Sequence, residues 1–123
     1  MTLNVPPNPQ EPSMISYDHF ASVDLRVGTI VRVEPFPKAR KPAYKVWADF
    51  GSEIGLRQTS VQITVHYTPE TLVGKQIVGC LNLGDKNIGG FISNCLCTGF
   101  PDENGAVVLI SPDKAVPNGG KLF

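Results

Sequence analysis

The sequence predicts an all-β fold: a small Greek-key barrel with a short N-terminal helix and a helical turn between its third and fourth strands. Composition gives the first reason. A chain of 123 residues has the length of one domain, and its 12 glycines and 11 prolines favour many short strands and turns over long helices. Periodicity gives the second reason, because apolar residues alternate with polar ones in several short runs.

The N-terminal residues divide the chain into a tail and a domain. Residues 1–14 are rich in proline and poor in apolar side chains, so we expect a flexible tail before a single domain of residues 15–123. Ser16 is a candidate N-cap for a short helix, and the side chains of Phe20 and Val23 are expected to face the core.

Three strands are expected in the first half of the domain. The first strand, residues 25–33, should place one face inward, formed by Leu25, Val27, Thr29, Val31 and Val33. Gly28 within it indicates a bend or a bulge, as a small barrel needs where a strand turns a corner. The second strand, residues 43–50, should place inward Tyr44, Val46, Ala48 and Phe50. The third strand covers residues 56–63.

Turn residues punctuate the second half. Pro69 and Glu70 open a helical turn that ends at Gly74. The remaining expected elements are a fourth strand over 76–83, a turn around Lys86 between two glycine-containing pairs, a fifth strand over 91–99, and an apolar strand over 106–110. A sandwich fits this strand count too. The helical turn between the third and fourth strands favours a barrel of the oligonucleotide/oligosaccharide-binding (OB) type.

Basic residues are concentrated in one region of a formally neutral chain. The protein has 11 Lys and Arg against 11 Asp and Glu, yet residues 26–45 contain six cations and the single acid Glu34. Aromatic residues are interleaved with these cations, as on surfaces that hold a flexible or anionic polymer. A solvated, lysine-rich loop is the alternative interpretation.

Two classes of binding function fit this region. A protein that holds unfolded polypeptides needs an exposed apolar groove with a polar rim. The candidate peptide-binding residues are Phe36, Pro37, Arg40, Lys41, Tyr44, Trp47, Gln58, Ser60 and Phe91. A tRNA-binding module needs basic side chains along phosphates. The candidate RNA-binding residues are Lys38, Arg40, Lys41, Lys45, Arg57 and Lys86.

Other functions find little support in the residues. The two histidines, His19 and His66, have no metal-ligand spacing around them, and the three cysteines lack zinc-site spacing, so we expect free thiols, no metal, no cofactor and no catalytic activity. The sequence contains no glycine-rich phosphate-binding loop of the GxxxxGK(S/T) type, so we do not expect the protein to use ATP. No signal peptide or apolar run long enough to cross a bilayer is visible, so a cytoplasmic protein without membrane insertion is expected.

Several separated blocks resemble the tRNA-binding domain family. The first is DLRVGTI at residues 24–30. Two further blocks, FPKARKPAYKVWADFG at residues 36–51 and EIGLRQTSVQIT at residues 53–64, resemble a group of export-related chaperones within that family. The resemblance implies an OB-fold homodimer in the cytoplasm that binds unfolded or pre-secretory polypeptides and works with the export machinery. It also implies tRNA as a partner through the parent family.

The chain departs from the family pattern at two positions. The family's Ser-Glu-Gly-Met motif reads Ser-Asn-Cys-Leu here, at residues 93–96, so that Ser93 alone carries over as an RNA-binding residue. Lys86 stands where the chaperone group tends to have arginine, and lysine is a poorer bidentate partner for phosphate.

Overall fold

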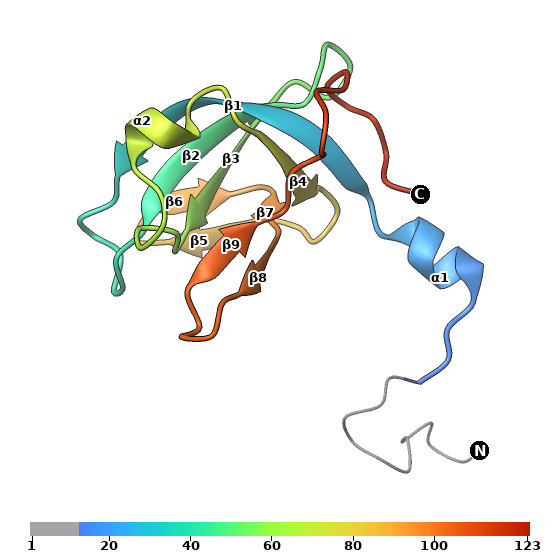
Figure 1. Ribbon diagram of the computed structural model, residues 1–123, viewed down its shortest axis with the longest axis horizontal. Helices are drawn as coiled ribbons and strands as arrows, with labels where there is room; N and C mark the ends of the chain where they lie inside the picture. The colour runs from blue at the N-terminus through green and yellow to red at the C-terminus, as the bar shows by residue number, and fades with distance from the viewer. Residues whose placement is uncertain (1–12) are drawn as a thin grey trace.

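Short strands make up most of the computed structural model, which describes residues 13–123 (Figure 1). The expected tail, residues 1–14, therefore lies outside the described residues except for Ser13 and Met14. The elements are α1 (Tyr17–Ser22), β1 (Leu25–Pro35), β2 (Tyr44–Asp49), β3 (Leu56–Val61), α2 (Pro69–Leu72), β4 (Gln76–Cys80), β5 (Lys86–Ile88), β6 (Phe91–Ser93), β7 (Leu96–Cys97), β8 (Gly99–Pro101) and β9 (Val107–Leu109).

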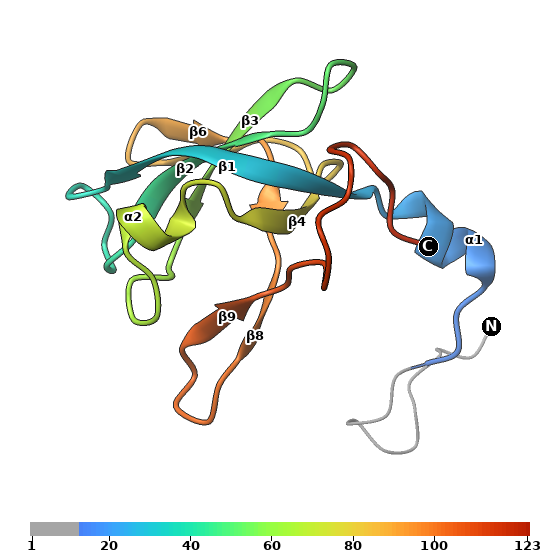
Figure 2. The same ribbon diagram turned by 45° about the horizontal axis from the view of Figure 1, so that its top comes forward.

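The long strand β1 is the centre of a five-stranded antiparallel sheet with the order β3-β2-β1-β4-β7. Its first half pairs with β4, from Leu25 opposite Cys80 to Thr29 opposite Gln76, and its second half pairs with β2. Because one strand serves two neighbours along different halves of its length, the sheet curls around the core (Figure 2). The result is the small, nearly closed barrel that the sequence predicts.

The barrel closes between β3 and the residues that follow β6. The backbone N–H of Asn94 donates to the carbonyl of Gln58 over 2.9 Å, and the Asn94 side-chain oxygen accepts from the Gln58 N–H, also over 2.9 Å. Two residues further along β3, the Ser60 N–H donates to the hydroxyl of Ser93 over 3.0 Å. In residues 13–123, hydrogen bonds from the backbone of β3 to this segment end at Ser60.

The inner face of β1 differs from the sequence prediction. Ile30 pairs with Ala48 but Arg32 pairs with Trp47, so Val31 is an extra residue in a β-bulge. Ile30 is 1% exposed and Val31 is 47% exposed, which makes the predicted assignment of both residues wrong. The bulge shifts the alternation by one position, and the sequence pattern could not reveal it because Ile30 and Val31 are equally apolar.

The predicted inner face of β2 is confirmed. Val46, Ala48 and Phe50, the residue after β2, are each at most 1% exposed. The Phe50 ring reaches across the barrel to two glycines: a Cβ at Gly28 would lie 2.7 Å from the ring, and one at Gly79 would lie 2.8 Å from it. Gly28 therefore provides space for Phe50 and is not itself the site of the bulge.

The second half of the chain is divided more finely than predicted. Residues 86–88, predicted as part of a turn, form β5, which pairs with β6 in a hairpin (the β5–β6 hairpin). Gly89 and Gly90 connect the two strands with positive φ angles of 57° and 87°, a conformation that glycine adopts without strain. The single strand predicted over 91–99 is interrupted and becomes β6, β7 and the start of β8.

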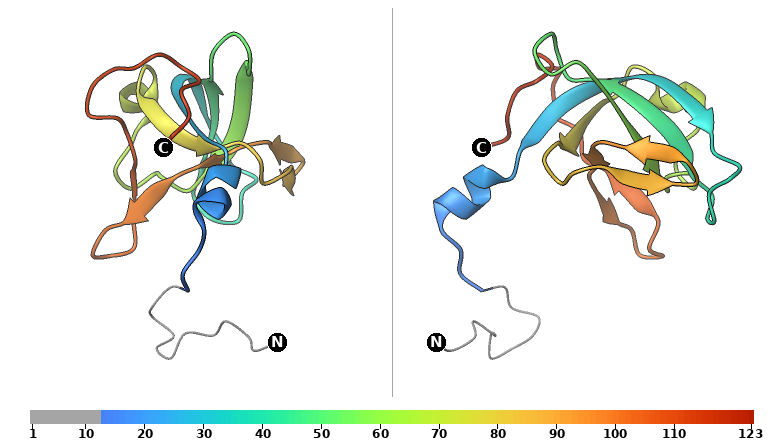
Figure 3. Two further views of the ribbon diagram at one scale, coloured as in Figure 1. Left: turned by 90° about the vertical axis from the view of Figure 1, so that its right-hand side faces the viewer. Right: turned by 180° about the vertical axis from the view of Figure 1, so that it is seen from behind.

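The helix α1 begins at its predicted cap but does not pack as predicted. The Ser16 hydroxyl accepts the N–H of His19 over 3.2 Å. No residue of α1 is buried, and Val23 is 41% exposed, so the predicted inward orientation of Val23 is wrong. Figure 3 shows α1 extending away from the barrel beside the C-terminal segment, where the Lys121 ammonium donates to the carbonyl of Ala21 over 2.7 Å.

The β8–β9 hairpin projects from the barrel on the side opposite β1 (Figure 2). His66 lies 2.7 Å from the Asp102 carboxylate in the β8–β9 turn, and the Tyr67 hydroxyl accepts the N–H of Leu109 over 3.0 Å. The hydrogen bond with His66 is the main cause that lowers the pKa of Asp102. These contacts fix the hairpin to the loop after β3. Neither helix among the described residues is long and apolar enough to cross a membrane.

The close approach of Gly28 to Phe50 predicts a specific loss of stability. Gly28→Ala forces the buried Phe50 ring to move, and overpacking of this kind costs about 1–3 kcal/mol. Gly120→Ala is the control, because its nearest new contact would be at an ordinary 3.7 Å. Urea unfolding measures both changes, and equal stability of the two variants would contradict this account of the core.

Candidate functional site

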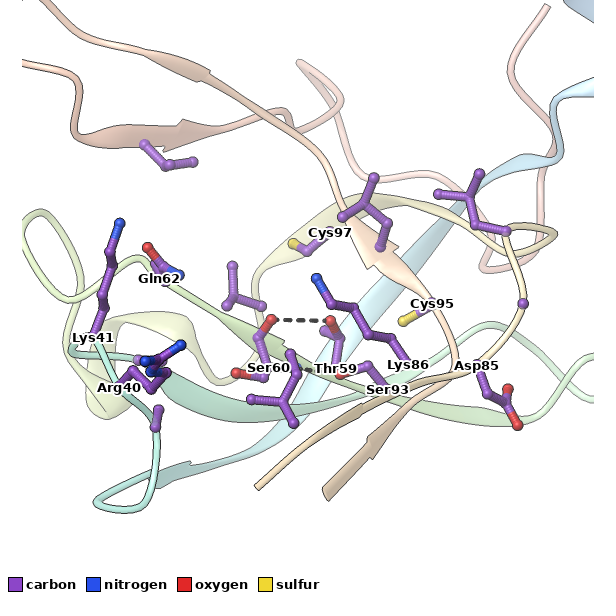
Figure 4. A pocket seen from close by; sticks show the side chains of 18 residues that line it. Arg40, Lys41, Thr59, Ser60, Gln62, Asp85, Lys86, Ser93, Cys95 and Cys97 are labelled. Atoms are coloured by element: carbon purple, nitrogen blue, oxygen red, sulfur yellow. Dashed lines mark hydrogen bonds between the residues drawn. The ribbon is translucent and has the colours of Figure 1, made fainter. Parts of the chain in front are cut away.

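A groove of about 790 Å³ lies where the barrel is incompletely closed (Figure 4). Its walls come from the loop before β2, from β5, from the end of β3, and from the chain between β6 and β7. Its lining residues are Ala39, Arg40, Lys41, Ala43, Thr59, Ser60, Val61, Gln62, Leu83, Gly84, Asp85, Lys86, Ile88, Ser93, Cys95, Leu96, Cys97 and Val107. This surface is called the larger groove below.

The larger groove combines an apolar floor with cationic walls. Cys95 and Cys97 are buried at its base, while Leu83 and Leu96 are 66% and 50% exposed at its edge. Arg40 and Lys41 lie on one wall and Lys86 lies on the other (Figure 4). Among the described residues of the lining, Asp85 is the single acid.

Burial at the base of the groove disfavours the reactive thiolate form of Cys95 and Cys97. Burial raises the pKa of Cys95 to about 11 and the pKa of Cys97 to about 12. Both thiols therefore stay protonated near neutral pH. Attack on a substrate and metal binding both require the thiolate form instead. Residues 13–123 contain no group of three or more His, Cys, Asp and Glu side chains arranged to hold a metal. The predicted free thiols are confirmed for Cys80, Cys95 and Cys97, which are all buried.

A smaller groove of about 350 Å³ lies at the turn of the β5–β6 hairpin. It is lined by Phe36, Pro37, Lys38, Lys45, Gly89, Gly90 and Phe91. The loop before β2 contributes residues to both grooves, and so does the β5–β6 hairpin. One loop and one two-stranded hairpin thus shape both surfaces.

Aromatic rings and cations alternate beside the smaller groove. The ring centroid of Phe91 lies 5.6 Å from that of Phe36 and 5.7 Å from that of Trp47, both edge to face. The Lys45 ammonium lies 4.9 Å from the centroid of Phe36 and 5.2 Å from that of Phe91. The Arg32 guanidinium covers Trp47 at 4.7 Å. We call these five residues the aromatic–cation stack, and it attaches the β5–β6 hairpin to the face of β1 and β2.

The side chain of Gln58 also holds the hairpin in place. Its oxygen accepts the indole N–H of Trp47 over 3.0 Å, and its amide group donates to the carbonyl of Ile92 over 2.7 Å. Both ends of the amide are therefore used inside the protein. Gln58 acts as a link between β3, Trp47 and β6 and not as a free hydrogen-bonding group on a groove wall.

The structure distributes the predicted site residues over three places. The larger groove contains Arg40, Lys41, Ser60, Lys86 and Ser93. The smaller groove contains Phe36, Pro37, Lys38, Lys45 and Phe91. Neither groove is lined by Tyr44, Trp47, Arg57 or Gln58.

The residues outside the grooves make internal contacts. The Tyr44 hydroxyl donates to the carbonyl of Tyr67 over 2.9 Å. The Arg57 guanidinium donates to the carbonyl of Asn94 over 3.0 Å, at the point where the barrel closes. Trp47 packs within the aromatic–cation stack and does not line the larger groove.

Sequence reasoning missed the apolar side of the larger groove. Leu83, Leu96 and the two cysteines at its base were not among the predicted binding residues. They come from segments after β4 and β6, far in sequence from the basic region, and nothing in their local pattern distinguishes a groove from a core.

A family model described as "Putative tRNA binding domain" matches residues 25–121. The chain belongs to the tRNA-binding domain family.

Solved structures and curated sequences agree with this assignment. A chaperone CsaA from Bacillus anthracis is 43% identical with a TM-score of 0.84, and the match covers 90% of this chain and 100% of that one. A CsaA chaperone protein from Picrophilus torridus is 41% identical with a TM-score of 0.83, covering 89% and 100%. The methionine–tRNA ligase of Methanosarcina mazei is 34% identical over 109 residues, which are 89% of this chain but 15% of the ligase.

Proposed function

We propose that the protein is an ATP-independent chaperone that holds unfolded or pre-secretory polypeptides in its larger groove. The observation that carries the proposal is the apolar base and exposed leucine edge of that groove, together with its polar rim. Likeness over the whole length of two CsaA chaperones supports it. On this proposal the protein is not an enzyme, acts in the cytoplasm and delivers clients to the export machinery.

Removal of the apolar edge is expected to reduce holding. The double variant Leu83→Ser with Leu96→Ser should at least halve the suppression of aggregation of an unfolded client at roughly stoichiometric ratio, because a holdase acts by binding the unfolded state. Leu56→Ser is the matched control, since Leu56 is 56% exposed but lines neither groove. Light scattering measures the effect. Full suppression by the double variant would move the client site elsewhere.

Binding of tRNA is the second candidate function, and exposed cations favour it. Lys38, Arg40 and Lys41 are exposed, and none of the three takes part in the ion pairs formed within residues 13–123. Cations outside internal ion pairs are available to phosphates. Lys45 is less available, because it lies over two aromatic rings of the aromatic–cation stack.

The salt dependence of tRNA binding tests this candidate. Arg40→Ala with Lys41→Ala should weaken binding and reduce the slope of log K against log salt by about two, about one for each phosphate that is no longer neutralised. Lys114→Ala is the control, because Lys114 is exposed but lines neither groove. An unchanged slope in the double variant would place any RNA site away from this loop.

We also propose that the protein is a homodimer. Exposed apolar side chains remain on α1 and on the β8–β9 hairpin, with Tyr17 71%, Phe100 65% and Val108 41% exposed. An isologous contact would bury the same apolar surface on each of the two subunits. Sedimentation equilibrium should give twice the mass of the chain at micromolar concentration, and a monomer under those conditions would overturn the proposal.

A further inference from the structure

The open edge of β3 is the feature of the larger groove that the proposed function leaves unexplained. β3 is an outer strand of the five-stranded sheet, and the chain around Ser93 and Asn94 pairs with only part of its free edge. An unpaired strand edge exposes N–H and C=O groups in the arrangement that another strand can join.

The direction of these groups follows from the observed hydrogen bonds. The N–H and C=O of Gln58 both bond to Asn94, on the side away from β2, and the Ser60 N–H bonds to Ser93 on that same side. Because backbone groups alternate in direction with a period of two, those of Gln62 are expected to point the same way.

The carbonyl of Ser60 and the backbone of Gln62 are free positions of this edge beside the larger groove. The Ser60 carbonyl accepts only a 3.3 Å bond from the neighbouring Thr59 hydroxyl within the described chain. Gln62 is exposed, and its N–H and C=O make no hydrogen bond to another backbone group in residues 13–123. Both residues line the larger groove.

We propose that the larger groove binds its client as an added β-strand, along the edge of β3 at Ser60 to Gln62, and that it selects acidic over basic segments. The proposal deepens the function proposed above and rests on it. Backbone pairing serves many sequences, because it does not depend on client side chains. Alternate client side chains would then face the apolar base at Cys95 and Leu96.

Charge decides which segments are preferred. Three cations, Arg40, Lys41 and Lys86, stand against the single acid Asp85 among the described lining residues. An extended client with acidic residues is therefore complementary to the walls, whereas a basic one is repelled. The positively charged beginning of a secretory signal peptide is a poor match, so the segment held would come from another part of a pre-secretory client.

Peptide probes test the backbone pairing directly. A dye-labelled peptide of alternating valine and glutamate should bind, with an affinity measured by fluorescence anisotropy. In an added strand, the backbone N–H groups of every second peptide residue point toward β3. N-methylation of these residues, which share one parity, should weaken binding at least about tenfold, because it removes the donors and blocks strand pairing. N-methylation at the other parity should change the affinity less than about twofold. Equal weakening for both parities would overturn strand addition.

Variants of the protein test the same edge from the other side. Gln62→Pro removes one backbone donor and should weaken peptide binding about tenfold relative to Gln62→Ala, which shortens the same side chain but keeps the donor. The far-ultraviolet circular dichroism of both variants checks that the barrel is intact. If Gln62→Pro does not fold, the N-methylated peptides decide the question alone.

Exchange of charges tests the selection. A valine–lysine peptide should bind the wild type at least about tenfold more weakly than the valine–glutamate peptide. Lys41→Glu with Lys86→Glu should narrow or invert that preference, and Lys114→Glu should leave it unchanged. No preference in the wild type would overturn the selection of acidic segments.

The outcomes separate this inference from the proposed function. Suppression of aggregation without any parity effect keeps the holding function and rejects strand addition. A parity effect without suppression supports the strand site and rejects holding as the activity. If both peptides fail to bind while tRNA binds the wild type and Lys41→Glu with Lys86→Glu abolishes that binding, the groove is an RNA site and the inference is wrong.

Discussion

The partial closure of the barrel between β3 and the residues after β6 is the constraint on which the binding surfaces depend. A pair of bonds between Gln58 and Asn94 and one bond from Ser60 to the Ser93 hydroxyl join these segments. If pairing continued along β3, the larger groove would be filled by backbone. If this pairing were absent, the apolar base at Cys95 and the core behind it would be exposed to water. At the last position the Ser93 hydroxyl accepts the N–H of Ser60, and a side chain cannot continue the backbone ladder. The groove therefore begins where these hydrogen bonds end.

The β5–β6 hairpin contributes residues to both the larger and the smaller groove. It is attached to the sheet by the Phe91 contacts of the aromatic–cation stack and by the Gln58 amide. Two lysines have different surroundings because of this attachment. Lys45 is held over two rings, whereas Lys86 extends from the hairpin into the larger groove. Lys45, close in sequence to the exposed cations, therefore packs within the protein, whereas Lys86, far from them in sequence, lines the larger groove.

The sequence predicted the barrel well and the groove in part, and the difference has a physical cause. Alternation gave the inner face of β2, and capping residues gave the start of α1, because both signals are local. The bulge after Ile30 escaped prediction because two apolar neighbours hide a shift of register. The larger groove escaped for another reason. Its cationic wall is contiguous in sequence, but its apolar base comes from residues beyond β4 and β6, and only the pairing of distant strands brings Cys95 and Leu96 into one groove with Arg40.

The two proposed ligands, a polypeptide and a nucleic acid, make different demands on this geometry. A cationic rim attracts any anionic polymer at long range, and this attraction does not distinguish a phosphate chain from an acidic peptide. Discrimination must come from short-range contacts inside the groove. The larger groove offers an apolar base and an unpaired strand edge, which match an extended peptide, while its described lining contains no aromatic ring on which a base could stack. The aromatic rings lie instead beside the smaller groove, where Phe36 and Phe91 pack against each other and under Lys45. Chemistry within the two grooves thus favours polypeptide in the larger one, and any preference for RNA would have to use the cations of the loop that both grooves share.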